Sequence, residues 1–254
     1  MADSGFPDRP DFLTDDIVAA LNAGTCKHAF DVLGPHKSGN KRWITTLQPD
    51  AVDVFATVGS KKIALHHVAG SVFTGPVPGK SYELTMRYAD GNTTTTSDPF
   101  SFAPVLTDFD RYLVGEGTHK ALWRVLGAHV TQHQGVSGVH FAVWAPNARQ
   151  VSVIGDFNMW DGRRLPMRPA GETGVWETFI PGVTEGAQYK YQITGSDGQL
   201  RDKADPVGFG SQHPPEQASI VRDIGGYRWN DANWMRARAT RAERAQPISI
   251  YEVH

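Results

Sequence analysis

An internal repeat constrains the fold of this chain more than any other feature of its sequence. Residues 32–36 (VLGPH) recur at 125–129 as VLGAH. Farther along, the match keeps a constant spacing of 107 residues, at which Tyr82, Asp90-Gly91, Asp98-Pro99 and Phe102 recur as Tyr189, Asp197-Gly198, Asp205-Pro206 and Phe209. Because copies of one motif adopt one fold, we predict two similar domains of about 90 residues in tandem.

Each copy consists of short apolar segments separated by turn residues. The 254 residues include 26 glycines and 16 prolines, which favours tight turns over long helices. The Asp-Gly pair in each copy has the composition of a hairpin turn. The segment before the second pair alternates apolar and polar side chains, in the order Tyr189, Lys190, Tyr191, Gln192 and Ile193. This pattern predicts an all-β fold of two tandem immunoglobulin-like β-sandwiches, although two small barrels would show the same pattern.

Three regions follow one another along the chain. Residues 1–115 are predicted to form the first sandwich, with a short helix at 14–23 that Thr14 caps and Gly24 ends. Residues 116–228 are predicted to form the second sandwich. Residues 229–254 comprise a basic linker and a final segment, 247–254, with apolar side chains on both faces. Such a segment is typical of a central strand in a parallel sheet, so the sequence indicates a chain cut off at the first strand of a further domain.

Composition argues against several classes of partner. The formal net charge of −2 gives no basic surface for nucleic acid or for an anionic membrane. No apolar segment approaches the ~20 residues that cross a bilayer, and no secretory signal is visible. The single cysteine, Cys26, cannot form an intramolecular disulfide, which fits a cytoplasmic location. The histidines match no metal-binding spacing, so we predict no metal site or cofactor. Asp156, Asp161, Glu172 and Glu177 could pair as an acid and a base, but they fall around strand ends of the repeat, so we predict no catalytic residue.

The turn after residues 151–154 distinguishes the second copy from the first. It contains Asn158, Trp160 and Asp161, whereas the first copy has residues 59–64 (GSKKIA) at this place. The flat face of Trp160 could lie against a sugar ring while Asn158 and Asp161 bond its hydroxyl groups. Alternatively, Trp160 plugs the end of the sandwich core, because tryptophan is highly buried on average.

Five motifs carry a family resemblance. They are LVGEGTH at 113–119, VLGAH at 125–129, FAVWAPNARQVSV at 141–153, GDFNMWDGR at 155–163 and ISIYEVH at 248–254. Together they resemble the amino-terminal region of bacterial 1,4-α-glucan branching enzymes. The resemblance implies an amino-terminal β domain, a family-48 carbohydrate-binding module at 116–228, and the opening strand of a catalytic (β/α)8 barrel at 247–254. The catalytic carboxylates of that family lie in the barrel, beyond His254.

The resemblance also implies a sugar site. In related glycogen-binding modules a tryptophan and a lysine line this site, and they correspond here to Trp160 and Lys190, to which we add Asn158 and Asp161. A second platform tryptophan is replaced by Gln199-Leu200. The implied partners are α-glucan and the chain's own catalytic barrel. Two alternatives are a free-standing glycogen-binding regulatory module and a scaffold that only stabilises the barrel.

Overall fold

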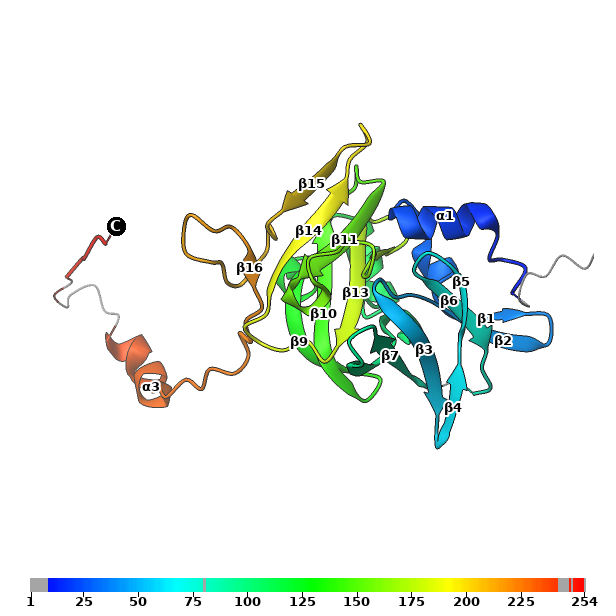
Figure 1. Cartoon of the computed structure of the whole chain (residues 1–254). Helices are drawn as coiled ribbons and strands as arrows, with labels where there is room; N and C mark the ends of the chain where they lie inside the picture. The colour runs from blue at the N-terminus through cyan, green and yellow to red at the C-terminus, as the bar shows by residue number, and fades with distance from the viewer. Residues whose placement is uncertain (1–8, 80, 242–246, 248, 254) are drawn as a thin grey trace, which may run out of the picture. The chain divides into compact units, whose positions relative to one another are not determined.

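The first sandwich consists of two antiparallel sheets of four strands each. The structure, a computed structural model, describes residues 9–79, 81–241, 247 and 249–253 (Figure 1). One sheet has the order β1 (Gly34–Ser38), β2 (Lys41–Leu47), β6 (Val72–Pro76) and β5 (His66–Ala69). The other has the order β4 (Lys61–Ala64), β3 (Ala51–Val58), β7 (Glu83–Tyr88) and β8 (Thr93–Ser97). Their facing sides share one buried core, which includes Ile44 and Phe73 of the first sheet and Val54 and Leu84 of the second.

The second sandwich repeats this plan. One sheet has the order β12 (Arg168–Pro169), β13 (Val175–Pro181), β10 (Val136–Trp144) and β9 (Gly127–His133). The other has the order β11 (Gln150–Gly155), β14 (Gln188–Thr194) and β15 (Leu200–Lys203), and β16 (Ser219–Ile220) also pairs with β14. Phe141, Val153 and Tyr191 lie in the core between the sheets. The two sheets of each copy remain separate, so the all-β sandwich prediction is confirmed and closed barrels are excluded.

The constant spacing of the repeat preserves a buried hydrogen bond. The hydroxyl of Tyr82 donates to Asp98 Oδ2 at 2.5 Å, and the hydroxyl of Tyr189 donates to Asp205 Oδ2 at 2.6 Å. Both carboxylates are shielded from solvent, at 1% and 9% residue exposure. A buried carboxylate needs a hydrogen-bond donor, so each copy retains its own tyrosine.

Short helices flank the sandwiches. The helix α1 (Asp15–Ala23) begins after Thr14, whose Oγ1 accepts from the Ile17 amide, and ends at Gly24 with φ 69°, as predicted. Its buried side chains pack with residues of β2 and β6. The helix α2 (Asp108–Gly115) lies in the connection between the copies. The 3-10 turns are η1 (Ala29–Asp31), η2 (Pro99–Ser101), η3 (Leu122–Arg124) and η4 (Asp156–Asn158).

The buried carboxylate of Glu177 holds the segment that connects the two copies by hydrogen bonds. Oε2 of Glu177 in β13 accepts from the backbone amides of Val105 and Leu106 at 2.9 and 3.0 Å, and it also contacts His140 Nε2 at 3.1 Å. Burial alone would raise the pKa of Glu177, but the hydrogen bonds and the charge of His140 hold this pKa below its usual value. The connection is therefore attached to a sheet of the second sandwich.

The chain divides into one compact unit that ends at Arg222 and a second unit that begins at Asp223. The second unit contains α3 (Ala232–Arg241). The strand predicted at 247–254 is not formed at residues 247 and 249–253, where Ile250 and Tyr251 are 89% and 91% exposed; residues 248 and 254 lie outside the described residues. A strand needs a neighbour to pair with, and among the described residues none pairs with this segment. Within the described part of the chain, no helix has the length and hydrophobicity to span a membrane.

Candidate functional site

Asn158 holds together the turn that follows β11. Its Oδ1 accepts from the Gly155 amide at 2.8 Å, and its Nδ2 donates to the carbonyls of Val153 at 2.9 Å and Asp161 at 3.3 Å. The residue is only 5% exposed. Its hydrogen-bonding groups are thus engaged by the backbone, so Asn158 shapes the turn and is not placed to bond a sugar hydroxyl. This corrects the hypothesis drawn from the sequence.

The turn directs Trp160 out of the core. Met159 and Trp160 both have φ 58°, in the left-handed region, and the Trp160 amide donates to the Gly155 carbonyl at 3.0 Å. The indole Nε1 donates to Asp156 Oδ1 at 3.2 Å, and the residue is half-buried. Phe157 instead packs against the core, with its ring 5.7 Å from that of Phe141. The alternative in which Trp160 plugs the end of the core is therefore wrong.

Trp160 and Lys190 line one open cleft of about 340 Å³, which we call the Trp160–Lys190 cleft. Lys190 lies in β14, where it pairs with Ile154 of β11, and its side chain is partly buried. The other lining residues come from β14 and from the segment before β16: Gln188, Gln212, Pro215, Glu216, Gln217 and Ala218. The structure thus brings together the two residues that the family resemblance implied.

The sequence analysis did not identify the two glutamines, Gln188 and Gln212, that line this cleft. Gln212 Nε2 donates to Gln188 Oε1 at 2.7 Å, and Gln212 Oε1 accepts from the Ala218 amide at 2.9 Å. Gln188 shares the outward alternation of Lys190 along β14, and this signal could have identified it. The segment at 212–218 has no comparable periodicity, and the hydrogen bond from Gln212 to Gln188 joins it to β14.

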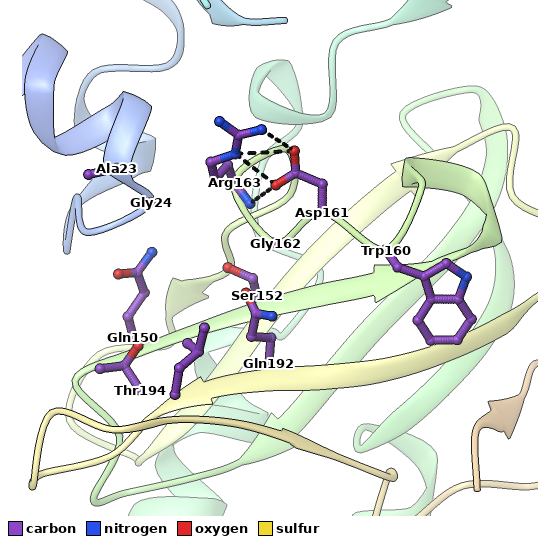
Figure 2. Close-up of a pocket in the computed structure, with 11 residues that line it drawn as sticks. Ala23, Gly24, Gln150, Ser152, Trp160, Asp161, Gly162, Arg163, Gln192 and Thr194 are labelled. Atoms are coloured by element: carbon purple, nitrogen blue, oxygen red, sulfur yellow. Dashed lines mark hydrogen bonds and ion pairs between the residues drawn. The ribbon is translucent and has the colours of Figure 1, made fainter. Parts of the chain in front are cut away.

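Asp161 lies in a second cavity that Trp160 also lines. This cavity, of about 360 Å³, is drawn in Figure 2 and extends over the outer face of β11 and β14. Asp161 forms an ion pair with Arg163, whose Nη2 lies 2.7 Å from Oδ2. Burial would raise the pKa of Asp161, but the hydrogen bonds from Arg163 and the charges of Arg163 and Arg164 hold this pKa below its usual value. Asp161 is therefore a carboxylate whose charge is neutralised by its neighbour.

The residues around Trp160 favour binding over catalysis. An aromatic face, an ammonium group and several carboxamides can contact the ring and the hydroxyl groups of a sugar. Retaining glycoside chemistry needs two carboxyl groups about 5 Å apart. Among the described lining residues, however, the Trp160–Lys190 cleft contains only Glu216 and the second cavity only Asp161.

Two family models match parts of the chain. Residues 14–100 match the alpha-1,4-glucan branching enzyme GlgB, N-terminal domain. Residues 125–208 match carbohydrate-binding module 48, also described as the isoamylase N-terminal domain. The second match contains both Trp160 and Lys190.

Relatives agree with these matches. The 1,4-alpha-glucan branching enzyme GlgB of Roseobacter denitrificans is 48% identical over 92% of this chain, and that of Rubrobacter xylanophilus is 45% identical over 94%. The chain spans about a third of these relatives, 33% and 34% of their lengths. Among solved structures, a type I pullulanase from Bacillus subtilis is 16% identical over 74% of this chain and 26% of its own, with a TM-score of 0.35. The resemblance predicted from the motifs is confirmed: the chain corresponds to the amino-terminal region of the 1,4-alpha-glucan branching enzyme family, a GlgB-type N-terminal domain followed by a family-48 carbohydrate-binding module.

Proposed function

We propose that the chain binds α-1,4-glucan in the Trp160–Lys190 cleft and positions it for a branching enzyme whose catalytic barrel lies beyond His254. The observation that carries this proposal is the partly exposed indole of Trp160, which shares a cleft with Lys190 inside the region that matches a carbohydrate-binding module. The indole face would cover the apolar face of a glucose ring. Lys190 and Gln188 would donate hydrogen bonds to its hydroxyl groups.

The contact would be weak for a single short sugar. Covering about 100 Å² of apolar surface contributes roughly 2–3 kcal/mol before ordering costs. A binding free energy near −4 kcal/mol corresponds to a dissociation constant of about 1 mM. Such a site is useful for a polymer, because glycogen presents many chains and one chain can rebind before it diffuses away.

The same proposal includes the parent reaction and its setting. The complete enzyme would cleave an α-1,4 bond and transfer the released chain to a 6-hydroxyl group, forming a branch of cytoplasmic glycogen. The chain's second partner would be the barrel that carries the catalytic carboxylates. Because neither cavity around Trp160 offers a carboxylate pair, we expect the 254 residues alone to leave the iodine stain of amylose unchanged.

Native electrophoresis through a gel that contains glycogen tests the proposed site. We expect the glycogen to retard the wild-type chain and not the Trp160→Ala variant. Trp144→Ala is the matched control, because Trp144 is also exposed on the second sandwich, at 58%, but does not line either cavity around Trp160. Both variants should unfold near the wild-type temperature, since both indoles lie at the surface. If glycogen retards Trp160→Ala as strongly as wild type, the proposed site is wrong and the scaffold alternative gains.

A further inference from the structure

Two buried polar side chains of β11 have no hydrogen-bond partner among the described residues. Gln150 is 9% exposed and Ser152 is 4% exposed, and neither is among the fully enclosed polar side chains that lack a partner in the described part of the chain. Their polar ends therefore open into the cavity that both residues line, where they can bond water or a ligand. Both side chains lie on the outer face of their sheet, away from the sandwich core.

The strand pairing arranges these side chains in a row that leads to the proposed sugar site. On the outer face, the cross-strand pairs of β11 and β14 are Gln150–Thr194, Ser152–Gln192 and Ile154–Lys190. Successive pairs on one face of a sheet lie about 6.6 Å apart. The row therefore runs about 13 Å from Lys190, in the Trp160–Lys190 cleft, to Gln150.

A wall from the first sandwich turns this row into a groove. Gln150, Ser152, Gln192 and Thr194 line the cavity of about 360 Å³ that Trp160 also lines, and the end of α1, at Ala23 and Gly24, lines it from the other domain. Figure 2 shows Gln150 and Thr194 below the end of α1 and Trp160 at the opposite end of the cavity. We call this cavity the outer-sheet groove.

Two glycines in the wall of the outer-sheet groove occupy positions where a larger side chain would clash with a neighbour. A Cβ atom on Gly162 would lie 2.1 Å from Gln192 Oε1, and one on Gly24 would lie 3.0 Å from Arg163 Cγ. Gly24 also has φ 69°, which favours glycine. The first glycine leaves space for the Gln192 carboxamide, and the second lets α1 approach the turn that carries Trp160.

The lining chemistry selects an uncharged polyhydroxylated ligand. Its uncharged polar groups are carboxamides and hydroxyls, which both donate and accept hydrogen bonds, and Trp160 and Leu200 add apolar surface that can cover the face of a sugar ring. The one ion pair, Asp161–Arg163, is internally neutral, so it offers no free charge to an anion. An apolar ligand would displace water from the Gln150 and Ser152 side chains without replacing its hydrogen bonds, which is costly.

We propose that the outer-sheet groove is a second subsite for the glucan chain that binds in the Trp160–Lys190 cleft. The chain would run from Trp160 along β11 and β14 to the end of α1, and its hydroxyl groups would bond Gln150, Ser152 and Thr194. This inference rests on the proposed function and extends it, because the first sandwich then forms one wall of the glucan site. A maltose unit fills only the cleft, whereas maltoheptaose reaches the outer-sheet groove.

Two side-chain signals in the NMR spectrum of the ¹⁵N-labelled 254-residue chain test the two sites separately. The indole N–H of Trp160 reports on the Trp160–Lys190 cleft, and the carboxamide of Gln150 reports on the outer-sheet groove. We expect maltose to shift only the indole signal and maltoheptaose to shift both. The carboxamide of Gln132 is the control signal, because Gln132 is exposed on β9 in the other sheet and should respond to neither sugar.

Variants test the contribution to affinity. The double variant Gln150→Ala with Ser152→Ala should bind maltoheptaose about tenfold more weakly than wild type, which is equivalent to ~1.4 kcal/mol, while its affinity for maltose stays the same. Gln132→Ala should bind both sugars as wild type does.

The two proposals fail in different ways. If maltoheptaose shifts the Trp160 indole but leaves the Gln150 carboxamide unchanged, the groove holds only water, and the second subsite is wrong while the proposed function stands. If neither sugar shifts the Trp160 indole, both proposals fall. Because these signals come from the wild-type chain, the test does not depend on the folding of any variant.

Discussion

Replacing Asn158 by alanine tests whether this residue shapes the sugar site or contacts the sugar itself. The substitution removes the partners of the Gly155 amide and the Val153 carbonyl, which Asn158 bonds at 2.8 and 2.9 Å. Leaving a buried backbone group unpaired costs about 1–3 kcal/mol, so we expect a loss of about 3 kcal/mol in the free energy of unfolding. For a unit of this size, that loss lowers the melting temperature by roughly 6–12 °C.

The same variant should lose glycogen binding without any lost contact to sugar. Met159 and Trp160 stand at φ 58°, a conformation that costs about 1–2 kcal/mol per residue and persists only while the turn enforces it. Without Asn158 the turn relaxes and the indole leaves the cleft. Calorimetry gives the melting temperature, and the glycogen gel gives the binding.

Asn92→Ala is the matched control for this experiment. Its carboxamide is exposed and bonds only Asp90 Oδ2, so we expect a change within about 0.5 kcal/mol. A melting temperature of Asn158→Ala within about 2 °C of wild type, together with lost retardation, would refute the positioning role and restore Asn158 as a sugar contact. A large drop in melting temperature with normal retardation would show that Trp160 does not need the turn.

Two further predictions concern the sandwiches themselves. Burial raises the pKa of Asp98 from 3.8 to about 6 despite hydrogen bonds from Tyr82 and Phe100, so the folded state takes up a proton before the unfolded state as the pH falls. Urea unfolding should therefore show that wild type gains about 1 kcal/mol more stability than Asp98→Asn between pH 7 and pH 5; equal gains would mean that Asp98 stays ionised. Gly155→Ala would place a Cβ atom 2.3 Å from the Gln188 carbonyl oxygen and should cost about 2–3 kcal/mol, whereas Gly115→Ala meets no atom within 4 Å and should stay within about 0.5 kcal/mol in the same assay.

The sequence by itself determined the features that depend on local hydrogen bonding and on side-chain alternation. The repeat of Tyr82 and Asp98 as Tyr189 and Asp205 indicated two domains of one fold, because copies of one motif adopt one fold, and the structure shows each pair as a buried hydrogen bond. The helix bounded by Thr14 and Gly24 was also predictable, since its caps bond within a few residues. These features need no information from distant parts of the chain.

Only the tertiary structure decided which side chains serve the site. Asn158 and Trp160 are two residues apart in one turn, yet the backbone engages the first and exposes the second, and the local sequence is compatible with either arrangement. Residues 247–254 have a strong strand pattern, yet the described residues of this segment form no strand, because a strand requires a partner to pair with. Gln150 lines one cavity with the end of α1, which comes from the other domain. Contacts between segments far apart in the sequence determine which outward side chains are buried, engaged or left free for a ligand, and local periodicity does not encode those contacts.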